Sequence, residues 1–225
     1  GVQGIAASGN SPGSREESAS WTDVAGNLWV FGGYGKDVDG ISGYLNDLWR
    51  YSPSTGMWTW VSGHNFGGVA GVYGARGIPS SGNYPGARTD ASSWTDASGN
   101  FWLFGGYGID AAETYGLLND LWKYNPSTGI WTWISGSNQN GVIGFYGDKG
   151  IATSGNVPGA REEPATWIDG VGNLWVFGGY GPDSQNTTGY LNDLWKYNIA
   201  SGNWTWVSGT NLADSVGVNG VKGVA

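Results

Sequence analysis

The chain has 225 residues, of which 43 are glycine, 15 are tryptophan and 12% are charged. Disordered chains are poor in aromatic residues and ordinary α/β enzymes have about a quarter of their residues charged, so this composition disfavours both classes. The absence of cysteine excludes disulfides, thiolate nucleophiles and thiolate metal sites, and the single histidine, His64, excludes a site built from two imidazoles of one chain.

The charge balance argues against two classes of partner. Ten basic residues stand against eighteen acidic ones, and no Lys/Arg cluster occurs. We therefore expect no binding to nucleic acid and none to an anionic membrane surface.

No apolar run is long enough to span a bilayer, so we expect no membrane insertion. The chain starts in the middle of a repeated pattern, and we expect it to be processed or excised from a longer one. Few charges and many Gly, Trp, Ser and Thr favour a secreted protein, extracellular or at the cell surface.

A repeat of 73 residues organises the chain. The segments 26–35 (GNLWVFGGYG), 99–108 (GNFWLFGGYG) and 172–181 (GNLWVFGGYG) stand 73 residues apart, and all fifteen tryptophans follow the same register. The last six residues, GVKGVA, resemble the first six, GVQGIA. We therefore divide the chain into units 1–79, 80–152 and 153–225, each a repeat with its long connection.

Each repeat contains four short apolar runs. In the first repeat these are 18–23, 28–31, 45–51 and 57–61, and runs of this length, rich in Val, Trp and Tyr and bounded by Gly, Asn and Pro, are typical of strands. No stretch has helical periodicity. The run LWVF is apolar at consecutive positions, which indicates burial on both faces. The pattern predicts an all-β protein in which four-stranded antiparallel sheets pack face to face as propeller blades.

A recurring set of residues resembles the Kelch repeat. It comprises a Gly-Gly doublet after the second strand, then a Tyr and a Trp, with an Arg before the first strand and an Asn-Asp-Leu-Trp run before the Tyr. The doublets, Tyr and Trp are Gly32, Gly33, Tyr51 and Trp58; Gly105, Gly106, Tyr124 and Trp131; and Gly178, Gly179, Tyr197 and Trp204. The resemblance implies a Kelch-type β-propeller. The period of 73 exceeds the ~50 residues of a Kelch repeat and is more like that of bacterial exported Kelch-like arrays.

The same resemblance extends to the galactose oxidase central-domain superfamily, whose copper centre uses two His and a Cys-modified Tyr. With no Cys and one His, this chain does not carry that chemistry. We expect no cofactor, apart from a weak possibility of Ca²⁺ in the acidic loops between the second and third strands.

The Arg of each repeat is expected to pair with the Asp that opens the third strand. The predicted structural ion pairs are Arg15–Asp47, Arg88–Asp120 and Arg161–Asp193. We expect the two glycines to remove side chains that would otherwise block this bridge, and the pair to stabilise the blade when its remaining donors are also bonded.

The predicted ligand rim is the one that carries the 2–3 loops and the long blade connections, since alternating strand directions place both there. Its candidate residues are Tyr34, Asp37, Asp39, Tyr44, Tyr107, Asp110, Glu113, Tyr180, Asp183 and Tyr190. The neighbouring carboxylates Glu16-Glu17 and Glu162-Glu163 are not expected to form an acid–base pair. Repeat two has Thr89-Asp90 there, and adjacent strand residues point to opposite faces.

The functional expectation is a non-catalytic extracellular scaffold that binds a protein or a glycan on this rim. Two alternatives stay open: a structural protein that self-assembles through its blade faces, and a polysaccharide hydrolase or lyase that needs clustered carboxylates at the channel rim. Because three blades cannot close a propeller, we expect self-association or continuation. A longer array, a closed dimer with a second copy and a filament all satisfy this requirement.

Overall fold

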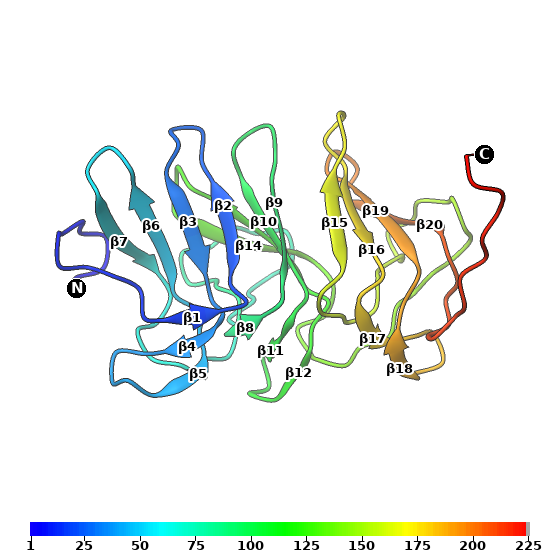
Figure 1. Cartoon of the computed structure of the whole chain (residues 1–225), viewed down its shortest axis with the longest axis horizontal. Coiled ribbons are helices and arrows are strands. Elements are labelled where there is room, and N and C mark those ends of the chain that lie inside the picture. Colours follow the sequence, from blue (N-terminus) through cyan, green and yellow to red (C-terminus); the bar gives the residue numbers. More distant parts are fainter. Residues whose placement is uncertain (224–225) are drawn as a thin grey trace.

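The computed structural model describes residues 1–223 and contains three four-stranded antiparallel sheets that stand side by side (Figure 1). Blade 1 consists of β2 (Ala19–Thr22), β3 (Leu28–Phe31), β6 (Leu48–Ser52) and β7 (Met57–Ser62). Blade 2 consists of β9 (Ser92–Thr95), β10 (Phe101–Phe104), β13 (Leu121–Asn125) and β14 (Ile130–Ser135). Blade 3 consists of β15 (Ala165–Ile168), β16 (Leu174–Phe177), β19 (Leu194–Asn198) and β20 (Asn203–Ser208). The blades predicted from the sequence are thus confirmed. Within residues 1–223 there is no helix long and apolar enough to cross a membrane.

The first strand of each blade lies innermost. Strand β9 contacts both β2 and β15, so these three strands line the propeller axis. In blade 2 every residue of Phe101–Phe104 is buried, as the unbroken apolar run predicts for a sheet that is covered on both faces.

Smaller sheets at one rim replace the loops expected after the second strand. Two of these sheets have three strands: β1 (Arg15–Glu16), β4 (Tyr34–Lys36) and β5 (Ser42–Tyr44), and β8 (Arg88–Thr89), β11 (Tyr107–Ile109) and β12 (Tyr115–Leu117). The third has β17 (Tyr180–Pro182) and β18 (Thr188–Tyr190). They lie along the lower edge of Figure 1. The 2–3 segments are therefore hairpins, and the Arg strand pairs with them instead of beginning the blade.

The opposite rim carries tight turns with the expected chemistry. The Asp23 carboxylate accepts hydrogen bonds from the backbone N–H groups of Ala25 and Asn27 and from the indole N–H of Trp29. Gly26 has φ +79°, a conformation that costs glycine little. The side-chain bonds hold the turn closed at the position that the sequence assigned to it.

Aromatic side chains fill the space between neighbouring blades. Trp21 stacks on Phe101 with ring centroids 5.2 Å apart, and Phe31 packs against Trp131 at 5.3 Å. The Trp21 indole also donates to the Trp102 carbonyl oxygen at 3.2 Å. Burial of large aromatic rings is the main stabilising contribution to these interfaces.

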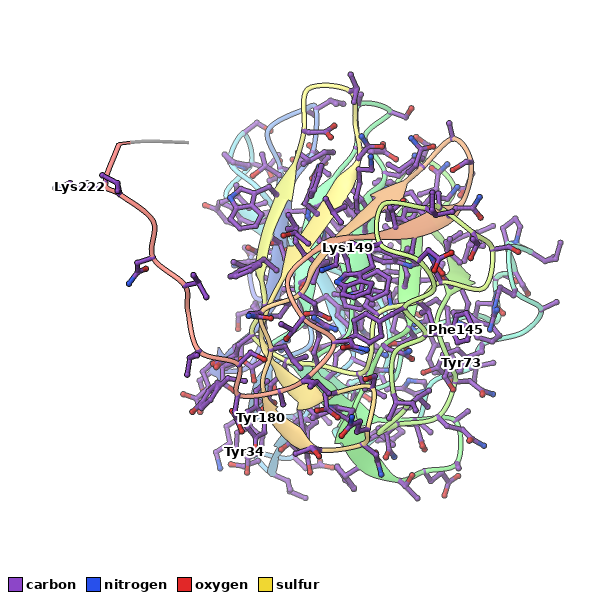
Figure 2. All side chains as sticks on the ribbon, turned by 90° about the vertical axis from the view of Figure 1, so that its right-hand side faces the viewer. Tyr34, Tyr73, Phe145, Lys149, Tyr180 and Lys222 are labelled. Carbon is purple, nitrogen blue, oxygen red and sulfur yellow. The ribbon has the colours of Figure 1, made fainter. Side chains whose placement is uncertain are left out.

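The long connections bind the outer part of the following blade. In the first, Tyr73 packs on Trp122 with centroids 4.9 Å apart, and the Arg76 guanidinium lies 4.6 Å from the Trp133 ring centroid. The second connection places Lys149 4.4 Å from the Trp206 ring centroid. Figure 2 shows Lys149 against the blades, whereas Lys222, one repeat later, lies on a segment that leaves them. The connections therefore join consecutive blades.

The Gly-Gly doublet has a different physical reason from the one expected. Gly32 and Gly33 have φ of +65° and +95°. A Cβ at Gly32 would lie 2.8 Å from the Arg88 carbonyl oxygen, and one at Gly33 would lie 2.4 Å from the Glu16 carbonyl oxygen. The Gly33 N–H also donates to the Arg88 carbonyl oxygen at 2.8 Å. The doublet thus allows one blade to approach the backbone of the next.

The outer flank of blade 3 is uncovered. Trp167 and Phe177 are 52% and 42% exposed, whereas their equivalents in blade 1, Trp21 and Phe31, are 5% and 1% exposed. Leu28, on the free flank of blade 1, is also exposed. The three blades therefore form an arc with an apolar surface at each end.

Candidate active site

The three predicted Arg–Asp ion pairs form beneath the glycine doublets and are confirmed. Arg88 Nη1 and Nη2 lie 2.6 and 2.7 Å from the two Asp120 carboxylate oxygens, and Nη1 also donates to the Gly105 carbonyl oxygen. The Tyr73 hydroxyl and the Trp122 indole donate to the same carboxylate, each at 2.7 Å. Every polar group of the pair is therefore satisfied, which is the condition for a buried ion pair to be stable.

These pairs are structural because they have no capacity left for a ligand. Burial alone would raise the pKa of Asp193, but the Arg161 charge and the Trp195 and Tyr146 donors hold that pKa below its usual range. Burial and the neighbouring Asp193 carboxylate both raise the pKa of the Tyr146 phenol, which stays protonated and donates.

Three carboxylates from the three blades meet at the axis, and we call Glu17, Asp90 and Glu163 the axial carboxylates. Each immediately follows the Arg strand or its equivalent, in the left-handed region, with φ of 57°, 54° and 51°. The Asp90 N–H donates to the Glu17 carbonyl oxygen, and the Glu163 N–H donates to the Asp90 carbonyl oxygen. This strained conformation at equivalent non-glycine positions is held by blade-to-blade hydrogen bonds.

The axial carboxylates line one cavity of about 280 Å³, together with residues of the innermost strands. Ser92 lines the same cavity, is 6% exposed, and its hydroxyl oxygen is buried without a hydrogen-bond partner. The equivalent residues in the other blades, Ala19 and Ala165, have no hydroxyl. The wall of this cavity thus contains a buried hydroxyl without a hydrogen-bond partner in one blade only.

Mutual repulsion raises the pKa of two carboxyls at this site. The Asp90 charge is the largest cause for Glu17, followed by burial and by Glu16. For Glu162, burial comes first, followed by the charges of Asp90 and Glu163. A carboxyl whose pKa is raised by a neighbouring carboxylate can act as an acid beside that carboxylate.

Several of the predicted rim tyrosines gather near the axial carboxylates. Tyr44 packs against Tyr34 at 5.3 Å and against Tyr107 at 5.7 Å. Burial, these tyrosines and the charges of Glu162 and Glu17 raise the pKa of the Tyr44 phenol. Tyr180 and Tyr190 form a separate pair at 5.5 Å. Figure 2 shows Tyr34 and Tyr180 at the same rim, and Figure 1 places their strands, β4 and β17, along one edge.

The aspartates of the predicted rim have structural partners in the hairpins. Asp110 accepts from the N–H groups of Ala112, Thr114 and Asn140, so it fastens the hairpin to the long connection. Asp37 and Asp183 accept corresponding bonds. Among residues 1–223, no group of three or more His, Cys, Asp or Glu side chains is placed to hold a metal ion. That the rim residues bind a ligand stays a prediction, and so does the binding of Ca²⁺ by the acidic loops.

The sequence reasoning passed over the axial carboxylates. It compared Glu16-Glu17 with Thr89-Asp90 of repeat two as adjacent pairs, and treated both members of a pair as residues of a regular strand. The turn at Glu17 removes that alternation. The 73-residue register already placed Glu17, Asp90 and Glu163 at one position, and a search for acidic residues across repeats would have found them.

Blade architecture, the glycine doublets and the buried Arg–Asp pairs together define a Kelch-type β-propeller. Residues 2–208 match the model of the family described as the KLHDC2/KLHL20/DRC7 Kelch-repeats domain, and the chain belongs to this family. The solved structure of YjhT has a similar fold, with a TM-score of 0.54 and 16% identity over 87% of this chain and 52% of that one.

The curated relatives are enzymes. The N-acetylneuraminate epimerases of Escherichia coli (strain K12) and Shigella flexneri are 28% and 29% identical over 176 residues, and each match covers 72% of this chain and 48% of the relative. N-acetylneuraminate epimerase 2 of Escherichia coli O6:H1 is 29% identical with the same coverage. The chain spans about half the length of the curated relatives it matches.

These relatives correct the functional expectation. The expectation of a non-catalytic scaffold is wrong, because the similar proteins are named as epimerases, and they favour the enzyme alternative. The expectation of a non-catalytic chain followed from setting aside Glu16-Glu17 and Glu162-Glu163 as adjacent strand residues that point to opposite faces.

Proposed function

We propose that the chain supplies acid–base groups for the epimerisation of a sugar, and that the axial carboxylates are those groups. The single observation that carries the proposal is the meeting of Glu17, Asp90 and Glu163 in one cavity of a chain whose curated relatives are epimerases. The nearby tyrosines offer apolar ring faces and hydroxyls that suit a sugar.

The chemistry needs only proton transfer. An ionised axial carboxylate removes the proton of the anomeric hydroxyl, while a protonated one gives a proton to the ring oxygen, and the ring carbon–oxygen bond breaks to leave an open-chain carbonyl. Rotation and the reverse transfers close the ring on the other face of that carbonyl. Glu17 suits the donor role because its raised pKa keeps it protonated to higher pH. We assign the acceptor role to Asp90, whose charge is the largest cause of that raised pKa.

The charge of the substrate affects this step. N-acetylneuraminate is an anion at neutral pH, and the axial carboxylates repel it. The arginines nearest to them in the chain, Arg15, Arg88 and Arg161, are already bound to aspartates. We therefore expect epimerisation of an anionic sugar to become faster as the pH falls and Glu17 gains its proton, and a neutral sugar to be less sensitive to pH.

The test is NMR exchange spectroscopy of sugar anomers with the 225-residue chain. N-acetylneuraminate and the neutral N-acetylmannosamine are the two substrates. We expect the chain to accelerate exchange for at least one of them. Glu17→Gln and Asp90→Asn should each lower the enzymatic rate by about a hundredfold, the scale of a lost acid–base group.

The matched control is Glu113→Gln, which removes a carboxylate at an exposed hairpin tip of the same rim. It should leave the rate within about twofold of the original chain. No acceleration of either sugar, or an equal loss in the control, would refute the proposal.

Three further properties remain proposals. Secretion to the cell exterior is supported by the low charge content and the abundance of Gly, Trp and Ser. Self-association is supported by the exposed aromatic flank at Trp167 and Phe177. A role of the rim tyrosines in sugar contact is supported by the packing of Tyr44 against Tyr34 and Tyr107.

A further inference from the structure

A second cleft lies between blades 1 and 2 at the rim opposite the axial carboxylates. It has a volume of about 340 Å³ and is lined by Trp29 and Arg50 of blade 1 and by Asn100 and Asn125 of blade 2. The turns that follow Asp23 and Asp96 border it. This volume is sufficient for a monosaccharide.

Arg50 is the residue that distinguishes this cleft. Its guanidinium lies 5.6 Å from the Trp29 ring centroid, and its Nε is buried without a hydrogen-bond partner. Arg15, Arg88 and Arg161 are in ion pairs and Arg76 donates to a carbonyl oxygen, whereas Arg50 has no ion pair or hydrogen bond within residues 1–223. A planar, unpaired guanidinium in a chain of net charge −8 is a site for a carboxylate.

The repeat shows that blade packing does not require this arginine. At the equivalent positions the other blades have Lys123 and Lys196, which lie 6.0 and 5.7 Å from the Trp102 and Trp175 ring centroids. A lysine therefore meets the packing requirement. Only the arginine offers the forked pair of N–H donors that matches a carboxylate.

Two side-chain amides in the cleft each have one polar atom without a hydrogen bond. In blade 3, Asn198 Nδ2 donates to Asn173 Oδ1 at 2.8 Å. The equivalent pair in blade 2, Asn125 and Asn100, has no such bond: within the described chain, Asn125 Nδ2 has no acceptor and Asn100 Oδ1 has no donor. The cleft thus offers one donor and one acceptor that suit sugar hydroxyls.

The carboxylate oxygens at the cleft already accept hydrogen bonds from local donors. Both oxygens of Asp23 are occupied by N–H groups of Ala25, Asn27 and Trp29, and burial is outweighed so that its pKa stays below the usual range. Asp96 is held in the same way by the N–H groups of its own turn and by Trp102. Neither aspartate forms an ion pair with Arg50.

We propose that this cleft binds a carboxylated monosaccharide, with the carboxylate on the Arg50 guanidinium and hydroxyls on Asn100 and Asn125. The site is separate from the axial cavity and does not depend on the proposed epimerisation. It gives the chain a sugar-acid binding surface on the rim away from the axial carboxylates.

The test is a titration of the ¹⁵N-labelled chain with D-galacturonate, with D-galactose as the neutral comparison. We expect D-galacturonate to shift the indole N–H signal of Trp29 and the side-chain amide signal of Asn125. D-galactose should bind at least about tenfold more weakly, because it lacks the charged partner of Arg50.

Arg50→Ala should weaken D-galacturonate binding at least about tenfold. Lys123→Ala, the same change in blade 2, is the matched control and should change the affinity less than about twofold. The Arg50 side chain makes no hydrogen bond within the described residues, so its removal should leave the unfolding midpoint near that of the control.

Four outcomes would overturn the inference. These are the absence of shifts at Trp29 and Asn125, equal affinity for D-galactose, unchanged binding by Arg50→Ala, and loss of the Trp29 shift in Glu17→Gln. The last outcome would place the sugar acid in the axial cavity instead. It would not decide the epimerisation proposal, which the anomer-exchange experiment tests.

Discussion

At the residue scale, the buried Arg–Asp pairs show how neighbours determine whether a charge stabilises a fold. Arg88 and Asp120 are fully enclosed and share donors and acceptors with Gly86, Gly105 and Tyr73. The Arg15–Asp47 pair is slightly more exposed, with both side chains at 8%, and no tyrosine hydroxyl reaches it within the described chain. The pairs are chemically alike, but their removal should not cost the same.

Arg88→Ala leaves the Asp120 charge buried without its main partner, and we expect it to lower the free energy of unfolding by about 3–5 kcal/mol. Arg15→Ala should cost less, because water can reach Asp47. Guanidinium unfolding monitored by tryptophan fluorescence measures both. Equal losses in the two variants would show that burial does not determine the cost.

Glu17 predicts a pH effect with a definite sign. Its folded-state pKa is raised by Asp90, burial and Glu16, so the folded chain binds more protons than the unfolded chain between the two pKa values. Stability therefore decreases as the pH rises through that window. Glu17→Gln removes this loss and should be more stable than the original chain above the window, by ~0.5 kcal/mol at most because solvent screens the charges. Thermal melts of both chains from pH 4 to 8 measure this effect. If the unfolding midpoints of the two chains changed with pH in the same way, the prediction would be contradicted.

At the element scale, the glycines of the doublet contact the next blade, whereas the glycines of the hairpin turns do not. Gly33 has φ +95°, and a Cβ there would meet the Ser18 hydroxyl and the Glu16 carbonyl oxygen. Gly26 has a similar φ of +79°, but a Cβ there would meet nothing within 4 Å. An alanine at Gly26 would therefore suffer only the strain of a positive φ, whereas an alanine at Gly33 would also clash with its neighbours.

Gly26→Ala should cost about 1 kcal/mol, from strain alone. Gly33→Ala should cost at least 2 kcal/mol more, because the Gly33 N–H bond to the next blade must also move. Chemical denaturation of the two variants makes the comparison. If Gly33→Ala were as mild as Gly26→Ala, the doublet would not be the joint between blades.

The elements also show how far sequence reasoning reaches. The 73-residue register predicts the blade strands and the Arg–Asp partners, because both follow from apolar runs and repeated charges. It did not predict the hairpins within the 2–3 segments, since Gly35 and Gly43 make those strands look like loops. The axial carboxylates were missed because the turn at Glu17 is stabilised by contacts with the next blade, which one repeat read by itself does not contain. The sequence does not distinguish Arg50 from other blade residues, because the lack of a hydrogen-bond partner for its Nε is visible only in the structure.

At the scale of the whole molecule, the two faces of a blade differ in whether another blade covers them. Trp21 and Phe31 are buried by the next blade, whereas Trp167 and Phe177 expose the same surface to solvent. Exposed aromatic patches of this kind mark interfaces. The 225-residue chain is therefore expected to associate through this flank.

Trp167→Arg should shift the chain toward the monomer in light scattering at micromolar concentrations. Val171→Arg is the control, since it puts the same charge on an exposed turn of the same blade. Leu28→Arg, on the free flank of blade 1, should act like Trp167→Arg if blade 3 of one copy packs on blade 1 of another. A monomeric original chain, or an effect confined to Trp167→Arg, would contradict this arrangement.

The pH–rate profile of anomer exchange tests the central claim, the acid–base role of the axial carboxylates, most directly. If protonated Glu17 donates to the ring oxygen, the rate of the original chain falls as the pH rises past the raised pKa of Glu17, and Glu17→Gln loses both the rate and this alkaline decline. Profiles of the same height and shape in the two chains would show that the carboxylates at the axis are not the catalytic groups.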